Sequence, residues 1–393
     1  MINPTTMPHD EMLEHSLKAQ SLLLPSAASR RALTNFFTRA LSAFQSSSDS
    51  AQKLQVVCTA PPASRSHASA SAAAQAQGEP YPQSPAPIPP AKRPHTLIVL
   101  DSSFNPPTLA HLRMATSAVE DTIKKKGNEK DITGLRLLLL LAVVNADKAP
   151  KPAAFDQRLA MMWAFARDVQ RALRGEEDEC PDEVLASGPG PKPHTTNNPE
   201  AEQKPGQQGP DISVDIALTS KPFFHEKSRA IAESEFYKPP AEGEKDTMEQ
   251  VILAGYDTLI RIFDPKYYGP PDPSRKGTPI QQALDPFFSR AKLRVTMRPD
   301  DEWGSKQEQL AHLESLLSEE GLAKMGGSKE WKDRIELVEG RKDGEEIVSS
   351  TYARQAAERE EWGKLTRLVS PGVGKWIEGE RLYVVDVKPG DVD

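Results

Sequence analysis

The chain has 393 residues, with 49 Lys and Arg against 56 Asp and Glu, a formal net charge of −7 and a hydrophobic fraction of 37%. Surfaces that coat nucleic acid are basic, so this balance argues against such a function, although it leaves room for local basic pockets. Two low-complexity stretches contain many of the 35 prolines, which predicts one sizeable globular domain with disordered additions.

The cysteines and the apolar runs of the sequence indicate the cellular compartment of the protein. The two cysteines are Cys58 and Cys180, and Cys180 lies in a polar segment, so we expect no structural disulfide and a reducing compartment. The longest apolar run, Leu137–Val144, is far shorter than the roughly 20 residues of a membrane-spanning helix. A basic stretch near the N-terminus is typical of mitochondrial transit peptides, but Asp10 and Glu11 argue against one. We therefore expect a protein of the cytoplasm and/or nucleus, without a membrane location.

The first predicted element is an amphipathic helix over residues 31–45. Its apolar residues recur at three- and four-residue spacing and are Leu33, Phe36, Phe37, Ala40, Leu41 and Phe44. A membrane-surface helix is the alternative, but the polar face has few Lys and Arg for binding anionic lipid. A short strand can follow at KLQVVCTA. We interpret residues 1–59 as a helical extension that packs on the core.

Residues 60–94, rich in Ala, Ser, Gln and Pro, predict a disordered linker, which places the start of the globular domain, residues 95–393, at His95. Within that domain, residues 174–211 have no apolar periodicity and predict a disordered surface insertion.

The pattern of the domain alternates between strands and helices. Strands are expected at 96–100, 135–144, 212–220, 251–255, 292–300 and 334–340. Helices are expected at 109–125 and 155–173, near 246–251, and at 256–263, 307–317 and from 350 onward. This β-α-β-α order predicts an α/β fold with a doubly wound, Rossmann-like parallel sheet.

The turn after the first of these strands, DSSFNPPTLAHLRM, is stiff and polar. In an open parallel sheet, ligands bind beyond the carboxyl ends of the strands. The turn leads into a helix N-terminus, where free backbone N–H groups and the helix dipole attract anions. Thr108 stands at this helix start and His111 in its first turn.

A second helix start, at Ser349-Ser350-Thr351, offers three hydroxyl groups, with Arg354 one turn later. Each motif alone is typical of an ordinary helix cap or of a structural histidine. Together, on this scaffold, the two helix N-termini with one His and one Arg predict a polyphosphate site.

These motifs resemble those of a known family. SSFNPPTLAHL resembles the first signature of the nucleotidylyltransferase superfamily, (H/T)xxH after a Gly-Ser/Thr-Phe-x-Pro turn, and VSSTYAR resembles its second, I-S-S-T-x-x-R. GYDTL, the VVNADKAPKP…FDQRLAMM region and the tail ending in Leu382-Tyr383 resemble eukaryotic nicotinamide mononucleotide adenylyltransferases. The likeness covers about residues 96–383 without the insertion, and it points to the divergent fungal branch linked to promotion of filamentation. It implies the HxGH nucleotidyltransferase type of Rossmann-like fold.

The resemblance also implies roles for matching residues. Thr108 and His111 would lie on the ATP phosphates, with His111 stabilising charge at the α-phosphorus. The β- and γ-phosphates would be held by Ser350, Thr351 and Arg354. Catalysis would therefore be assigned to His111, Thr108 and Arg354.

The other implied roles concern the two nucleosides. Gly255 and Asp257 would approach the adenosine ribose, while Ser103 and Phe104 would present backbone groups to the acceptor nucleotide. Weaker matches for phosphate contact are Lys148 and Arg158. Mg²⁺ would be carried by the ATP phosphates; His225 and Glu226 lack the spacing of metal ligands, so no protein-held zinc is expected.

The sequence departs from the family pattern at Ser102, where the family has glycine, and at Ala110. Contacts to a nicotinamide ring could come from Phe223, Phe224 or Trp163, although such residues more often belong to the core. The segment around His225, Glu226, Lys227 and Arg229 could bind the acceptor phosphate or form a solvated loop that leads into a helix.

The function predicted from the sequence is transfer of AMP from ATP to nicotinamide mononucleotide, giving NAD and pyrophosphate. Two alternatives stay open. One is a cytidylyl or other adenylyl transferase, or an ATP hydrolase, on the same fold. The other is a nucleotide-binding interaction protein whose chemistry has decayed. Neither protein partners nor the oligomeric state follow from the sequence.

Overall fold

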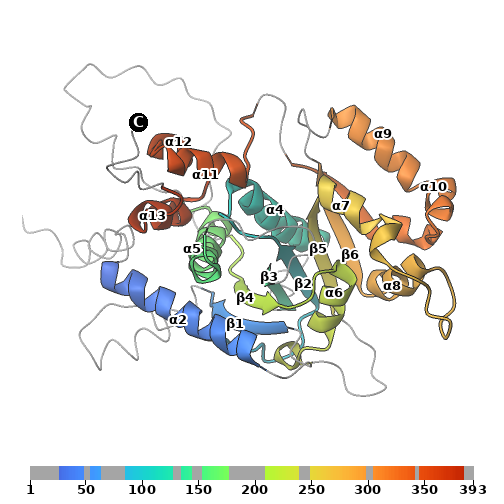
Figure 1. Cartoon of the computed structure of the whole chain (residues 1–393), viewed down its shortest axis with the longest axis horizontal. Coiled ribbons are helices and arrows are strands. Elements are labelled where there is room, and N and C mark those ends of the chain that lie inside the picture. The colour runs from blue at the N-terminus through green and yellow to red at the C-terminus, as the bar shows by residue number, and fades with distance from the viewer. Residues whose placement is uncertain are drawn as a thin grey trace, which may run out of the picture.

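A seven-stranded sheet forms the centre of the computed structural model (Figure 1). The structure describes residues 26–47, 54–62, 85–126, 134–143, 153–176, 209–238, 248–297, 304–340 and 345–384. The strand order is β1-β4-β3-β2-β5-β6-β7, and only β1 runs antiparallel, against β4. The strands are β1 (Leu54–Ala60), β2 (Thr96–Asp101), β3 (Leu135–Ala142), β4 (Ser213–Thr219), β5 (Glu249–Gly255), β6 (Ala291–Met297) and β7 (Ile335–Glu339).

Helices cover both faces of this sheet (Figure 1). One face carries α2 (Ala27–Ser46), α4 (Leu109–Lys126), α5 (Phe155–Arg174), α11 (Ser350–Glu358), α12 (Trp362–Leu365) and α13 (Pro371–Gly379). The other carries α6 (Phe224–Ala232), α7 (Tyr256–Ile262), α8 (Pro279–Phe288), α9 (Lys306–Leu316) and α10 (Glu319–Lys324). The expected doubly wound α/β fold is confirmed. Within the described residues, none of the helices combines the length and apolar character that crossing a membrane requires.

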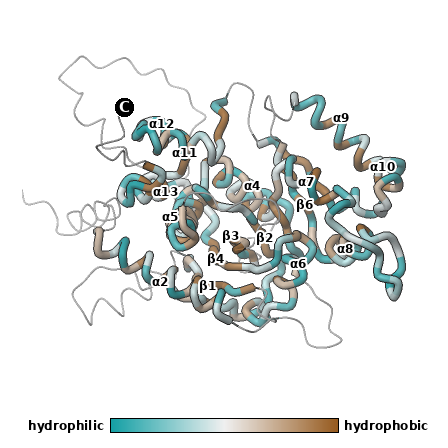
Figure 2. The backbone as a smooth tube through the Cα atoms, in the orientation of Figure 1, coloured by the Kyte–Doolittle hydropathy of each residue, from teal (hydrophilic) through white to brown (hydrophobic). Residues whose placement is uncertain are grey.

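The apolar strands explain why both faces are covered. Successive side chains of a strand point to opposite faces, and in β2 Ile98 and Leu100 join one core while Leu97 and Val99 join the other. Figure 2 shows hydrophobic residues concentrated along these central strands. A strand that is apolar on both faces, like the run in β3, is stable only when helices bury both of its faces.

The chain order creates a switch point beside β2. From β2 the chain moves outward to β3 and β4, and it then returns to β5 on the other side of β2. The loops that follow β2 and β5 therefore leave the sheet in opposite directions, which opens a crevice at their carboxyl ends. The stiff turn after Asp101 and the segment at Gly255 both lie at this crevice.

The N-terminal part is more closely joined to the sheet than the pattern predicted. Strand β1 extends the sheet along β4, and α2 packs on α5 and places Phe37 and Phe44 in the core. Residues 85–94, the end of the predicted linker, lie against this edge, where the Thr59 amide donates to the Ala86 carbonyl at 2.9 Å. Most of the predicted linker, 63–84, and of the insertion, 177–208, lies outside the described residues.

The expected helix near 246–251 is wrong, because β5 begins at Glu249 and pairs with β2 and β6. The β-branched and apolar residues that follow gain more from burial within the sheet than from a local helix.

Candidate active site

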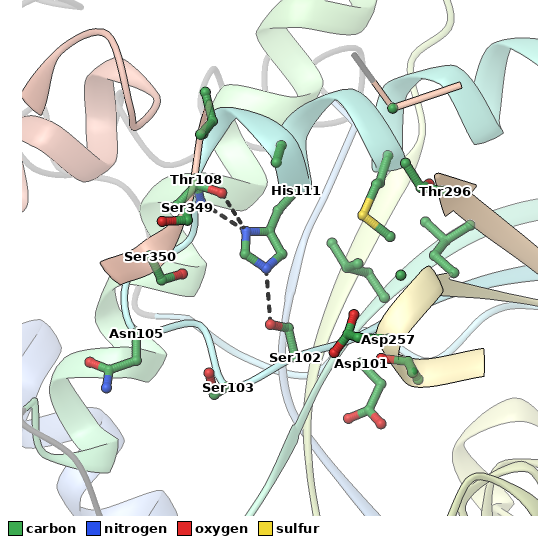
Figure 3. Close-up of a pocket in the computed structure, with 18 of the residues that line it drawn as sticks. Asp101, Ser102, Ser103, Asn105, Thr108, His111, Asp257, Thr296, Ser349 and Ser350 are labelled. Atoms are coloured by element: carbon green, nitrogen blue, oxygen red, sulfur yellow. Dashed lines mark hydrogen bonds between the residues drawn. The ribbon is translucent and has the colours of Figure 1, made fainter. Parts of the chain in front are cut away.

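A cavity of about 1130 Å³ opens at the switch point (Figure 3). Its walls come from the turn after β2, the start of α6, the start of α7 and the start of α11. The residues proposed from the sequence that line it include Ser103, Thr108, His111, Arg158, Gly255, Asp257, Ser350, Thr351 and Arg354. Lys148 lies outside the described residues.

The turn after β2 is anchored from below by Phe104. Its backbone has a φ of 45°, its ring is fully buried, and the ring centroid lies 5.8 Å from that of His111 and 6.4 Å from that of Phe165. Phe104 therefore supports the turn with its side chain, while the neighbouring Ser103 faces the cavity.

His111 is held from two sides (Figure 3). The Thr108 backbone N–H donates to His111 Nδ1 at 3.0 Å, and Thr108 Oγ1 lies 2.8 Å from the same nitrogen. On the other side of the ring, Ser102 Oγ lies 2.9 Å from Nε2. Because a backbone N–H can only donate, Nδ1 accepts, and the proton of the neutral imidazole is on Nε2.

The two motifs predicted to act together are joined by hydrogen bonds. Ser350 Oγ donates to the Pro106 carbonyl at 2.8 Å, and the Arg354 guanidinium donates to the Asn105 carbonyl at 2.7 Å. Arg354 also donates to Thr351 Oγ1 at 3.1 Å. The start of α11 is thereby fixed beside the turn that leads into α4, so two helix N-termini converge on one cavity.

A cationic residue of α5 adds to the positive side of the cavity. The Arg158 side chain donates to the Ala153 carbonyl at 2.9 Å, and its guanidinium lies 4.9 Å from the centre of the Phe155 ring. Burial and the nearby Arg354 lower the pKa of Arg158, while Tyr383 acts in the opposite direction. Two neighbouring guanidinium groups make this wall attractive to phosphate.

Asn105 and Tyr383 form a contact that the sequence reasoning missed. Tyr383, near the C-terminus, donates its hydroxyl to Asn105 Oδ1 at 2.8 Å, and burial raises the pKa of this phenol. The only advance signal was the Leu-Tyr pair in the tail. This hydrogen bond joins the segment after α13 to the turn after β2.

Gly255 and Asp257 form the opposite wall, where β5 passes into α7. Gly255 precedes the helix as its N-cap, and a Cβ at this position would lie 2.7 Å from Asp257 Oδ1. Glycine therefore leaves the space in which the Asp257 carboxylate sits at the start of α7. A carboxylate at that point is an acceptor for ligand hydroxyl groups.

The charged residues of the segment around His225 differ in their surroundings. Lys227 lines the cavity, but its ammonium forms a buried ion pair with Asp101, whose role had no sequence signal. Arg229 is instead half-exposed and lies 4.0 Å from Glu233 on the same helix. Helix α6 begins at Phe224, so the chain enters a helix within this segment, as the second interpretation expected.

Aromatic side chains line the far end of the cavity. The His225 ring stacks on Phe223 with centroids 5.8 Å apart, and it lies 5.7 Å from Tyr268. Burial lowers the pKa of His225, which favours its neutral form. Phe223 and Phe224 thus line the cavity, whereas Trp163 packs beside the core with Arg167 over its ring.

No group of three or more His, Cys, Asp or Glu side chains that could hold a metal ion occurs among the residues described.

Comparison with known proteins decides the family. No family model matches the sequence. The chain is 30% identical over 260 residues to a protein of Schizosaccharomyces pombe named "Putative nicotinamide mononucleotide adenylyltransferase", and the match covers 66% of this chain and 75% of that protein. The chain belongs to the nicotinamide mononucleotide adenylyltransferase family.

Two solved structures are also similar to this member of the family. Both are Plasmodium falciparum nicotinic acid mononucleotide adenylyltransferase, one complexed with NaAD and one with APC. They share 12% and 11% identity with this chain, cover 73% of it, and extend over 97% and 96% of their own chains. The TM-scores of 0.35 and 0.33 are too low to carry weight, so the family assignment rests on the sequence match.

Proposed function

We propose that the protein transfers AMP from ATP to nicotinamide mononucleotide, releasing pyrophosphate and forming NAD. The observation that carries the proposal is the meeting of two helix N-termini, with His111 and Arg354, at the switch point of the sheet. Membership of the family supports adenylyl transfer. The link to the filamentation-promoting fungal branch remains a prediction.

The triphosphate would bind between the starts of α4 and α11. Backbone N–H groups in a first helical turn have no partner within the helix, and the dipole favours anions there. Ser350, Thr351 and Arg354 would hold the β- and γ-phosphates. Thr108 and His111 would lie near the α-phosphate, with the protonated Nε2 of His111 on the side of the ring that faces Ser102.

The adenosine would extend toward the wall formed by Gly255 and Asp257. The Asp257 carboxylate can accept hydrogen bonds from the two ribose hydroxyl groups. The absence of a Cβ at Gly255 keeps that carboxylate in place.

The acceptor would occupy the remaining part of the cavity. Its phosphate would be bound by Ser103 and Arg158, both of which line the cavity. Its flat pyridine ring would pack against the aromatic end formed by Phe223, His225 and Tyr268. These contacts leave the acceptor phosphate directed at the triphosphate.

In the proposed step, an oxygen of the acceptor phosphate attacks the α-phosphorus of ATP in line. A new P–O bond forms to that oxygen, the bond to the bridging α,β-oxygen breaks, and pyrophosphate leaves with the electron pair. No covalent enzyme intermediate is needed, so the protein contributes positioning and charge stabilisation. We propose that Mg²⁺ enters with the ATP phosphates, which supply most of its ligands.

Product analysis tests this function. Purified protein is incubated with ATP, Mg²⁺ and nicotinamide mononucleotide, and NAD and pyrophosphate are measured; we expect them in equal amounts. Parallel reactions use nicotinic acid mononucleotide, CTP in place of ATP, or no acceptor. Product only with CTP, or ADP formation without any acceptor, would favour the other transferase or the hydrolase. Binding of ATP by calorimetry without any product would favour the decayed interaction protein.

A further inference from the structure

We propose that Ser102 is the substrate-facing end of a hydrogen-bond relay, through which His111 acts on the transferring phosphate. This proposal rests on the proposed function. It adds a role for Ser102, to which the proposed reaction assigned none. Ser102 lies between β2 and the helix start and lines the cavity. Its hydroxyl oxygen is 2.9 Å from His111 Nε2.

The direction of this hydrogen bond follows from the other side of the ring. The Thr108 N–H donates to Nδ1, so a proton on Nδ1 would face another donor. Nε2 therefore carries the proton and donates it to Ser102 Oγ. The reverse arrangement, with Ser102 donating to Nε2, would need the tautomer that Thr108 excludes.

A hydroxyl group that accepts one hydrogen bond still has its own hydrogen to donate. Ser102 can direct this hydrogen at an anionic oxygen in the cavity, and accepting from His111 makes it a stronger donor. The chain of donors then runs from the Thr108 amide through the imidazole and the Ser102 hydroxyl to the α-phosphate. No proton needs to be transferred, because each member only donates a hydrogen bond.

The backbone around Ser102 is suited to a fixed donor. Its amide donates to the Leu140 carbonyl of β3 at 3.3 Å, so the residue is held against the sheet. Ser102 is not one of the residues with positive φ, and Ala or Thr at this position therefore introduces no backbone strain. Substitutions here can probe the hydroxyl without distorting the turn.

Three variants separate a relay from a structural role. In Ser102→Ala the hydroxyl is lost while the Cβ still keeps the phosphate away from His111. We expect kcat to fall about 10- to 100-fold, as when a hydrogen bond to a charged group is removed. In Ser102→Gly the missing Cβ lets the phosphate approach Nε2 directly, so kcat should recover at least in part. Ser102→Thr, which retains a hydroxyl, should keep a higher kcat than Ser102→Ala.

A structural role predicts another order, because glycine adds backbone freedom and would be the most damaging of the three. The proposal is overturned if Ser102→Ala keeps the wild-type kcat, or if Ser102→Gly is as impaired as Ser102→Ala. A double variant supplies a further check. Ser102→Ala combined with His111→Ala should be no slower than His111→Ala alone, since both belong to one relay; additive losses would contradict the relay.

One measurement needs no catalysis. Nitrogen NMR of the ligand-free protein, with the His111 signal assigned by its loss in His111→Ala, should show the proton on Nε2; a proton on Nδ1 would overturn the relay. Titration with a non-hydrolysable ATP analogue should give about 10-fold weaker binding in Ser102→Ala than in the wild type; equal binding would contradict the proposal. If the wild type forms no dinucleotide, the proposed function fails, while these two measurements still decide the relay.

Discussion

His111 shows how one residue is prepared for chemistry by its neighbours. The hydrogen bond from the Thr108 N–H to Nδ1 places the proton on Nε2. The Ser102 hydroxyl, at the edge of the cavity, lies within hydrogen-bond distance of Nε2. Thr108 itself is buried, so its contact to the ring is protected from water. The imidazole is thereby orientated before any ligand binds, which reduces the reorganisation that binding would require.

Arg354 gives a prediction at the same scale. Its guanidinium bridges Asn105 and Thr351 and is proposed to hold phosphate, so a point charge cannot replace its planar set of donors. We expect kcat/KM for ATP to fall about 100-fold in Arg354→Gln and about 10-fold in Arg354→Lys. Steady-state kinetics at varied ATP measure this. A lysine variant with wild-type kinetics would show that geometry at this position is unimportant.

His225 predicts a pH dependence of stability. Burial lowers its pKa below the ordinary value of 6.5, so the folded protein binds this proton more weakly than the unfolded chain does. As pH falls through 6.5, the unfolded state gains the proton first, and the free energy of unfolding decreases. Urea titrations at pH 7.5 and 5.5 should show a larger loss for the wild type than for His225→Phe. If both proteins lose the same unfolding free energy between the two pH values, burial of His225 is not the cause of the pH dependence.

At the scale of elements, the sequence predicted the individual strands and helices better than the contacts between them. Strand β2, helix α4 and the start of α11 follow from periodicity and capping residues, because these signals are local. The bonds from Ser350 to Pro106 and from Arg354 to Asn105 join residues 244 and 249 positions apart. No local pattern encodes such contacts, and the same holds for Tyr383 and Asn105.

The Asp101–Lys227 ion pair is another contact of this kind, and it joins the end of β2 to α6. Both side chains are buried, at 7% and 9% exposure, so removing one partner leaves an unpaired charge away from water. We expect Lys227→Met to lower the free energy of unfolding by about 3–5 kcal/mol. In a double-mutant cycle, Asp101→Leu with Lys227→Met should cost less than the sum of the single changes; additivity would refute this coupling.

At the scale of the whole molecule, the N-terminal segment forms part of the same fold as the sheet. Helix α2 covers α5, β1 adds an edge to the sheet, and Arg30 of α2 forms an ion pair with Glu380 after α13 at 2.6 Å. The amphipathic spacing predicted that the helix packs on the core. Composition could not show that β1 joins the sheet, because a single short strand has no local signal for its partner.

Phe37 tests whether α2 is part of the same cooperative unit. Its side chain is fully buried beside Phe36, so Phe37→Ala should lower the free energy of unfolding by about 3–5 kcal/mol. Arg39→Ala, an exposed position on the same helix, serves as the matched control and should change it little. Denaturant unfolding of both variants decides this; equal stability would mean that α2 folds apart from the core.

The central claim, that this cavity catalyses adenylyl transfer through His111, is tested most directly by the turnover of His111→Ala with ATP, Mg²⁺ and nicotinamide mononucleotide. We predict that kcat falls at least about 100-fold, as expected when a transition-state donor is removed, while the free energy of unfolding changes little. Near-normal turnover in this variant would contradict the account.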